Sequence, residues 1–194
     1  MVQMEKDDNE LVKDYLEGKE GSFETIVKRY TRPLYSFVWR LCGNKESSED
    51  IVQETFLKVW KNIEKFDRER NFKVWIYAIA RNSTFDFLRK KKLIMFSEMD
   101  NIDEDSSFEE NIADTSPIAD KIFEDKETSE MINQIINALP EKYKEVVILR
   151  HETGMTFEDI SSTLKEPMNT VKSRYRRAVI KMQESLKMHQ KIAK

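Results

Sequence analysis

A helical repeat of apolar residues over 47–66 is the feature that most restricts the fold. In SSEDIVQETFLKVWKNIEKF these side chains recur at the spacing of one face of an α-helix. The stripe consists of Ile51, Val52, Thr55, Phe56, Val59, Trp60 and Ile63. Similar spacing recurs over 72–92 and after residue 140, and the 194 residues include only four glycines and four prolines for tight turns. We therefore predict an all-α fold.

The helix predicted at 47–66 also has a polar face. Ser47, with Asp50 three residues later, is its expected N-terminal cap. The face opposite the stripe consists of Asp50, Gln53, Glu54, Leu57 and Lys61. Leu57 is an apolar side chain among polar ones, so it either docks a partner or is one of the isolated leucines common on protein surfaces.

Charge is distributed in blocks that the net charge of −3 conceals. Residues 65–92 hold 9 basic and 3 acidic side chains, and residues 168–194 hold 8 and 1. Between them, residues 93–140 hold 2 basic and 13 acidic side chains. The acidic stretch 97–120 follows no helical or strand period, which is typical of a flexible spacer. The alternative is a mimic of nucleic acid that shields the basic blocks.

These blocks predict the domain organisation. Two small helical domains are expected at about 8–93 and 126–190, joined by an acidic flexible linker at 94–125. No internal repeat is present.

The second domain has the pattern of a helix-turn-helix motif. A first helix is expected with Pro140 at its first position and Gly154 as its C-cap. Thr156 and Asp159 form a capping pattern for a short second helix, which ends before Pro167. The face that this second helix buries consists of Phe157, Ile160 and Leu164.

The third helix of this domain is basic. Residues 165–182 hold six basic side chains and one acidic one, and Met168 or Asn169 is the expected cap. Its buried stripe is expected to be Val171, Tyr175, Ala178, Val179 and Met182. The first turns of such a helix reach base edges in the major groove, and cations hold phosphates. The expected DNA contacts are Asn169, Thr170, Lys172, Ser173, Arg176 and Arg177. A solvated basic helix is the alternative.

The segment 72–92 combines aromatic residues with a basic end. Its core side is expected to consist of Phe72, Ile76, Ile79, Ala80, Ser83 and Phe87. Another side carries Trp75, Ala78, Asn82, Phe85, Asp86 and Arg89. Aromatic rings beside cations suit the unstacked bases of single-stranded nucleic acid, although aromatic residues also fill cores. The short charged loop 67–71 is a further candidate contact for a strand or a flipped base.

Few residues could support catalysis or hold a metal. Cys42 is the single cysteine and His151 and His189 are the two histidines, so no zinc-binding set is evident, and no glycine-rich phosphate loop occurs. We expect no enzyme activity, cofactor or metal. One cysteine excludes an internal disulfide, and neither a signal peptide nor a membrane span is expected, which fits a cytoplasmic protein.

Three motifs in order resemble those of the extracytoplasmic-function class of bacterial sigma factors, the promoter-specificity subunits of RNA polymerase. EDIVQETFLKVW resembles the polymerase-binding helix of sigma region two, and FKVWIYAIARNSTFDFLRKKK resembles its promoter-melting helix. LPEKYKEVVILR with MTFEDISSTLKEPMNTVKSRYRRA resembles sigma region four. The resemblance covers nearly all of the chain except the acidic linker and the ends. The competing interpretation is a stand-alone helix-turn-helix regulator, which would need no single-strand surface at 72–92.

The resemblance implies partners and residue roles. The largest subunit of core RNA polymerase would be contacted by Asp50, Gln53, Glu54, Phe56, Leu57 and Trp60. The minus-ten promoter element would be read and held open by the loop 67–71 and by Asn82, Asp86, Arg89 and Lys90. Region four would read the minus-thirty-five element as duplex and touch the second-largest subunit. An anti-sigma factor would control the protein and could hold it at the inner face of the bacterial membrane.

One position departs from the family pattern. The turn before the last helix usually has a glycine followed by an apolar residue, whereas this chain has Lys165 and Glu166. Because a lysine adopts positive φ only at a cost, we expect a turn of different shape here.

Overall fold

The computed structural model describes residues 6–99 and 126–192, which form eight α-helices and one 3-10 turn with no strand among them. The elements are α1 (Asp8–Leu16), α2 (Ser22–Cys42), α3 (Lys45–Asn62), η1 (Ile63–Lys65), α4 (Phe72–Met99), α5 (Lys126–Asn137), α6 (Glu141–His151), α7 (Phe157–Leu164) and α8 (Met168–Ile192). The all-α prediction is confirmed. α4 continues past residue 93 to Met99, and most of the predicted linker, 100–125, lies outside the described residues.

The start of α3 differs from the prediction. Asn44, not Ser47, is the N-cap, and its side-chain oxygen accepts a hydrogen bond of 2.8 Å from the backbone N–H of Ser47. Asparagine is among the best N-cap residues, and Gly43 before it adopts φ of 68° to end α2. This tight junction fixes α3 against α2 and starts it at Lys45.

The predicted stripe of α3 is buried at five positions and wrong at one. The buried residues are Ile51, Val52, Thr55, Val59 and Ile63, while Phe56 is half-buried. Trp60 is 52% exposed, although its position in the stripe predicted burial. α3 packs against α2 and α4, and Trp60, at the edge of the stripe, faces solvent.

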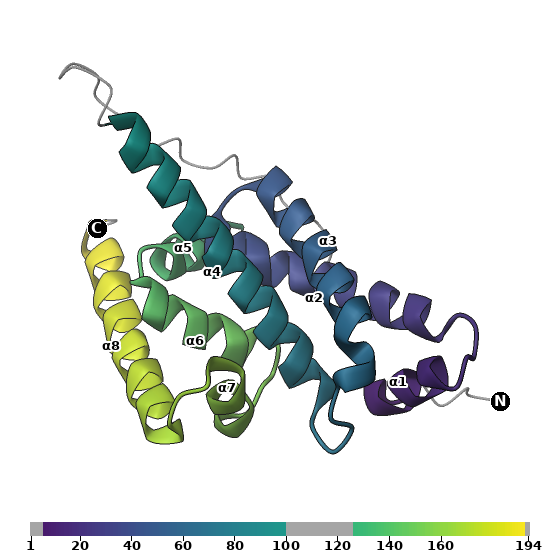
Figure 1. The fold of residues 1–194 in the computed structure, drawn as a ribbon. Helices are drawn as coiled ribbons and strands as arrows, with labels where there is room; N and C mark the ends of the chain where they lie inside the picture. The colour runs from purple at the N-terminus through teal and green to yellow at the C-terminus, as the bar shows by residue number, and fades with distance from the viewer. Residues whose placement is uncertain (1–5, 100–125, 193–194) are drawn as a thin grey trace.

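α4 is the central helix of the molecule. Figure 1 shows it running between α1, α2 and α3 on one side and the C-terminal helices on the other, and it packs against α2, α3 and α7. Of its predicted core residues, Phe72, Ile76, Ala80 and Ser83 are buried, and Ile79 and Phe87 are half-buried. One apolar cluster therefore extends from Leu11 in α1 to Val171 in α8.

Tyr77 was not predicted as a core residue, yet only 1% of it is exposed. Its ring meets those of Phe37 and Tyr30 edge to face, at centroid distances of 5.3 and 6.4 Å. Burial raises the pKa of its hydroxyl above the usual value. Tyr77 therefore helps to hold α4 against α2.

Charged side chains cross between the N-terminal helices and α6. Arg81 of α4 pairs with Glu145, whose side chain is only 3% exposed, and Arg40 of α2 pairs with Glu152. Lys73 of α4 donates a hydrogen bond to the carbonyl oxygen of Thr153. Burial raises the pKa values of both glutamates, although the arginines oppose this change. The junction between the two parts thus contains desolvated ion pairs as well as apolar contacts.

The helix-turn-helix segment follows its predicted sequence signals with small differences. Pro140 is the N-cap of α6 rather than its first residue, and Gly154 (φ 68°) lies two positions after the C-cap Glu152. The capping box of Thr156 and Asp159 is confirmed at α7. α8 begins at Met168, directly after Pro167.

Lys165 adopts the left-handed conformation that this turn requires, with φ of 54° and ψ of 42°. It is the only non-glycine residue with positive φ in the described part of the chain. The lysine therefore takes the glycine conformation, at a cost of about 1–2 kcal/mol, instead of reshaping the turn. Glu166 compensates in part, because it pairs with Arg174 of α8 at 2.8 Å.

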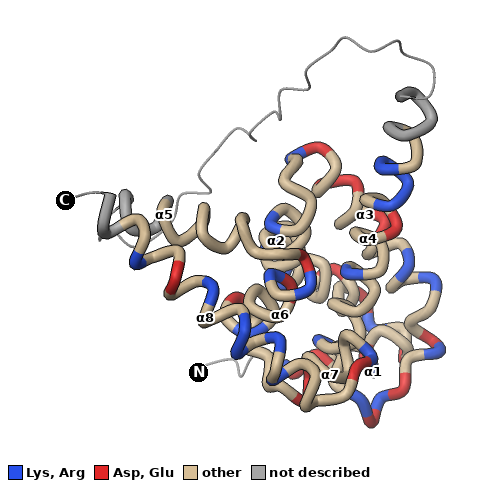
Figure 2. Tube along the Cα trace, turned by 90° about the vertical axis from the view of Figure 1, so that its left-hand side faces the viewer, with Lys and Arg blue, Asp and Glu red and all other residues tan. Residues whose placement is uncertain are grey.

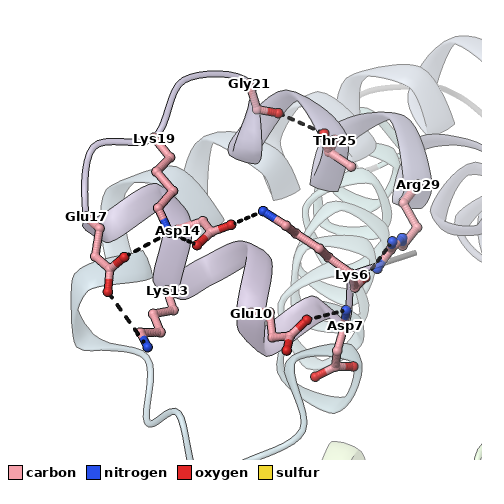
Figure 3. A network of polar contacts seen from close by, with 10 residues as sticks. All are labelled: Lys6, Asp7, Glu10, Lys13, Asp14, Glu17, Lys19, Gly21, Thr25 and Arg29. Carbon is pink, nitrogen blue, oxygen red and sulfur yellow. Dashed lines mark hydrogen bonds and ion pairs between the residues drawn. The ribbon is translucent and has the colours of Figure 1, made fainter. Parts of the chain in front are cut away.

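α1 is held by a network of charges at its two ends. Figure 3 shows Lys6 and Lys19 converging on Asp14, with Lys19 at 2.5 Å from one carboxylate oxygen. At the start of the helix, Asp8 pairs with Arg29 of α2 at 2.5 Å and accepts a hydrogen bond from Tyr30. These contacts join α1 to the flanking loops and to α2.

Asp14 should make the stability depend on pH. Hydrogen bonds from Lys19 and Lys6 lower its pKa from 3.8 to about 2. The resulting stabilisation is present above the unfolded pKa and is lost as the pH falls through about 2. We expect Asp14→Asn to lower the free energy of unfolding at pH 7, with the difference from the unmodified protein shrinking between about pH 4 and pH 2. Urea unfolding across this range measures it. Glu20→Gln, an exposed acid in the same region, is the control, and an equal difference at every pH would contradict the assignment.

The ion pair between Arg81 and Glu145 should behave as a buried pair. Arg81→Met leaves Glu145 buried without its cation, which costs about 3–5 kcal/mol, whereas Arg81→Met with Glu145→Met should restore most of that stability. Because the pKa of Glu145 is raised, it takes up a proton more readily in the folded state, so the single variant should lose less stability at pH 5 than at pH 8. Urea unfolding of both variants tests this. Equal stability of the single and double variants at pH 8 would contradict it.

Candidate nucleic-acid interface

The outer face of α8 carries the predicted DNA contacts. Asn169, Lys172, Ser173, Arg176 and Arg177 are exposed, and Thr170 is half-buried. On the inner face, Val171 and Ala178 are buried as predicted, whereas Tyr175, Val179 and Met182 are half-buried. The helix therefore separates an apolar side, which packs on α6 and α7, from a polar and basic side that faces solvent.

The inner face of α8 is fixed by Tyr175. Its ring packs edge to face on Phe157 of α7 at 5.3 Å and stacks on His151 of α6 at 5.7 Å. Its hydroxyl lies 2.9 Å from Nε2 of the same histidine. These contacts from two helices set the rotation of α8 about its axis, and hence the direction in which the basic residues point.

A hollow of about 450 Å³ lies beside the first turns of α8. Its lining residues are Lys142, Tyr143, Asn169, Thr170, Ser173, Arg174 and Arg177. Lys142 was not among the predicted contacts. Lys142 is the second residue of α6, and its position in the first turn of that helix is the sequence feature that could have indicated this contact. Three cations in the lining and a helix N-terminus make this hollow favourable for an anionic group such as a phosphate.

The second predicted nucleic-acid surface is a polar ridge on α4. Asn82, Asp86, Arg89 and Lys90 are all exposed and lie three to four positions apart on the helix, except that the last two are adjacent. Asp86 and Arg89 pair at 2.7 Å. Figure 2 shows basic positions gathered near the outer end of α4 and again along α8. The two basic blocks of the sequence are therefore separate surfaces of the fold.

The aromatic residues near this ridge are mostly packed. Trp75 is half-buried, and its ring lies 4.9 Å from Phe66 and 5.7 Å from Phe72. Phe85 is half-buried beneath the guanidinium group of Arg81, at 4.8 Å. The ridge therefore offers mainly polar and charged groups, with only the partly exposed faces of these rings for stacking on bases.

The outer face of α3 gathers the residues predicted to bind a protein partner. Asp50, Gln53 and Glu54 are exposed, Phe56 is half-buried, and Leu57 and Trp60 are 56% and 52% exposed. Glu54 pairs with Lys58 at 2.7 Å, and Lys58 also donates a hydrogen bond of 2.9 Å to Ser83 of α4. Two large apolar side chains beside three polar or acidic ones form a surface suited to a protein interface.

Residues 6–99 and 126–192 contain neither a cluster of metal ligands nor a helix that could span a membrane. No group of three or more His, Cys, Asp or Glu residues in these ranges could hold a metal ion. In the same ranges, no helix combines the length and the apolar character needed to cross a bilayer.

Two family models match separate parts of this chain. Residues 26–94 match the family described as Sigma-70 region 2, and residues 129–182 match Sigma-70 region 4. The first range contains the outer face of α3 and the ridge of α4, and the second contains α6, α7 and the basic face of α8.

Relatives match over nearly the whole chain. The chain is 33% identical to the ECF RNA polymerase sigma factor SigW of Bacillus subtilis over 168 residues, which cover 86% of this chain and 89% of the relative. It is 28% identical to the ECF RNA polymerase sigma-E factor of Haemophilus influenzae over 177 residues, covering 88% and 90%.

Solved structures share the fold. The sigma factor RpoE of Bartonella quintana, in complex with the anti-sigma factor NepR, matches with a TM-score of 0.70 and 25% identity, over 86% of this chain and 98% of that one. CnrH, in complex with the cytosolic domain of CnrY, matches in fold with a TM-score of 0.67 and 20% identity, over 93% and 97%. By its sequence and its fold, this chain belongs to the ECF family of RNA polymerase sigma factors.

Proposed function

We propose that this chain is an alternative sigma factor that brings core RNA polymerase to specific promoters and initiates transcription there, without catalysing a reaction itself. The observation that carries the proposal is the outer face of α8, which exposes neutral and cationic side chains while its inner face is fixed by Tyr175. A helix presented in this way can enter a major groove. The family membership supports the same function.

The surfaces of α3 and α4 distinguish this function from that of a stand-alone helix-turn-helix regulator. We propose that the outer face of α3, with Leu57 and Trp60, docks on the largest subunit of core polymerase. The ridge of Asn82, Asp86 and Arg89, with Lys90, then contacts the minus-ten element. A regulator that only binds duplex DNA would use neither surface.

We propose that α8 reads the minus-thirty-five element. Asn169, Thr170 and Ser173 lie in the first turns, nearest the base edges, and the cations of the following turn hold phosphates as well as bases. The hollow beside Asn169 and Thr170 adds Lys142 as a phosphate contact from α6. Contacts from two helices would fix the orientation of α8 in the groove.

We propose that an anti-sigma factor holds this chain inactive in the cytoplasm, at the inner face of the membrane. A protein of the same fold, RpoE of Bartonella quintana, was solved in complex with an anti-sigma factor. The exposed apolar residues of α3 and α8, among them Leu57, Trp60 and Ile180, give such a partner apolar surface to cover.

The direct test of the proposed function is reconstitution with core RNA polymerase on templates from the host genome. Transcripts that start at defined promoters only when this chain is added would support it. Binding of the chain alone to duplex DNA, with no effect on where polymerase starts, would instead favour a stand-alone regulator.

The face of α3 should determine the affinity for core polymerase. Leu57→Ala with Trp60→Ala should weaken binding by about 2 kcal/mol or more, because a buried tryptophan is a common hot spot of interfaces. The fold should persist, since both side chains are more than half exposed. Gln53→Ala with Glu54→Ala should weaken binding in the same direction. Met188→Ala, which removes an apolar side chain that is 65% exposed on α8, is the matched control. Unchanged affinity with unchanged helicity would count against this interface.

Neighbouring positions on α8 should affect DNA binding in different ways. Lys172→Ala should weaken binding to every duplex and reduce the slope of log K against log salt by about 0.9, the value for one phosphate contact. Ser173→Ala should change which duplex is preferred, by about 1–3 kcal/mol per disrupted base contact, with the slope unchanged. Arg176→Ala should behave as the lysine variant and Asn169→Ala as the serine variant. Titration against matched and scrambled duplexes at several salt concentrations decides it. A shift in preference for Lys172→Ala with no change in slope would mean that the two faces are exchanged.

A further inference from the structure

The loop between η1 and α4, residues 67–71, is exposed yet ordered by its own short contacts. The backbone N–H of Arg70 donates to the carbonyl oxygen of Asp67 at 2.9 Å, and that of Glu69 donates to the Asp67 carboxylate at 3.2 Å. The side chain of Arg70 also pairs with Asp67 at 3.2 Å. These contacts close the turn on itself, but they do not fix it to the rest of the protein.

At its end, the loop is tied to α4 by Asn71, whose Oδ1 accepts a hydrogen bond of 2.9 Å from the backbone N–H of Lys73. One side chain from α1 connects the preceding residues. Nδ2 of Asn9 donates hydrogen bonds to the carbonyl oxygens of Arg68 at 2.9 Å and Arg70 at 3.0 Å. Its Oδ1 accepts a hydrogen bond of 3.3 Å from the backbone N–H of Phe72, the first residue of α4. Both N–H donors of the Asn9 amide therefore bind the loop, and its carbonyl oxygen binds the first residue of α4.

The helix that carries Asn9 is itself firmly held. Its capping box is formed by Asp7 and Glu10. Asp8, the first residue of the helix, pairs with Arg29 of α2 and accepts a hydrogen bond from Tyr30. Tyr30 in turn packs edge to face on Phe72 at 5.7 Å. A displacement of the loop would therefore have to break the asparagine contacts or move a helix anchored on α2.

The contacts of Asn9 also determine which groups of the loop face solvent. The carbonyl groups of Arg68 and Arg70 point toward α1, and the side chains at 67–70 remain exposed. Within the described ranges, Arg68 forms no ion pair, unlike Arg70. A loop with a fixed backbone and an exposed guanidinium can hold a single base in one orientation, whereas a loop free to move would accept several.

We propose that Asn9 is a positioning residue for promoter recognition: by fixing the backbone of loop 67–71, it sets the sequence preference of the strand-separated element. The inference rests on the proposed function, with loop 67–71 contacting the opened strand beside the ridge of α4, as the family resemblance implies. Asn9 itself touches no DNA and acts only through the loop.

The test uses holoenzyme reconstituted from the full chain and core polymerase. A pool of duplex templates, randomised upstream of the start site, is first transcribed with the unmodified chain to define the preferred strand-separated element. Asn9→Ala and Asn9→Asp are then compared on the preferred template and on single-base alternatives. The aspartate keeps the size of the side chain but directs a negative charge at two carbonyl oxygens. Glu10→Ala is the matched control, because it weakens the start of α1 without touching the loop.

We expect Asn9→Ala to reduce the discrimination between bases at one or two positions of the strand-separated element by about fivefold or more. Asn9→Asp should reduce this discrimination further. Discrimination in the duplex element read by α8 should not change, and affinity for core polymerase should stay within about twofold. Arg68→Ala combined with Asn9→Ala should lose little more discrimination than either alone, since both act through one loop. Hydrogen exchange at the amide of Phe72 should accelerate in Asn9→Ala, which removes the acceptor of this N–H, and not in Glu10→Ala.

The outcomes are separable. If Asn9→Ala and Glu10→Ala lower transcription from all templates equally, with discrimination intact, Asn9 is only structural and the inference is wrong. If Asn9→Ala does not fold, the single variant Arg68→Ala tests the inference. Unchanged discrimination between bases in that variant would mean that the loop does not recognise a base, and the inference would then be wrong. If the unmodified chain directs no promoter-specific transcripts, the proposed function itself fails.

Discussion

The burial of α4 on two sides is the constraint on which the rest of the structure depends. Phe72, Ile76 and Ala80 are fully buried within an apolar cluster that also includes residues of α6, α7 and α8, while Lys73 and Arg81 contact the C-terminal helices. An ordinary amphipathic helix buries one face against one layer of structure, whereas α4 is covered by a layer on each of two sides. The N-terminal helices supply the first and the helix-turn-helix part supplies the second, so segments far apart in the sequence meet on one helix (Figure 1).

The charges at this junction limit how firmly the two parts are joined. Glu145 is buried against Arg81, and the side chain of Glu152 is 24% exposed beside Arg40. Desolvation raises the pKa of both carboxyl groups, although the arginines oppose this change. A buried ion pair adds little net stability compared with apolar side chains of the same shape, although breaking it on one side is costly. Separating the parts would return all four charged groups to water together. The junction is therefore specific in its geometry without being as strong as its buried area alone implies.

Local sequence patterns predicted local structure, and they missed what depends on distant residues. The capping box at Thr156 and the buried face of α3 follow from spacing along one helix, and both were found. The exposure of Trp60 depends on how α2 and α4 pack on α3, and the spacing of apolar residues along α3 does not predict this. Asn9 contacts carbonyl groups about sixty positions away, and its neighbourhood in sequence carries no sign of this. The sequence around Glu145 does not indicate that its carboxylate is buried, because its partner Arg81 lies on another helix.

The basic stretch 165–182 shows why a count of charges is a poor guide to binding. Its six cations do not form one surface. Arg174 is half-buried and bound to Glu166, and this pair supports a turn in which Lys165 holds a strained left-handed backbone. Arg174 therefore stabilises the turn before α8, and Lys165 contributes to that turn through its backbone conformation, not through its charge. Lys172, Arg176, Arg177 and Lys181 remain exposed on α8, so fewer phosphates can be neutralised there than six cations imply. Arg174 is used to support the turn before α8, and that turn sets the direction in which the exposed cations of α8 point.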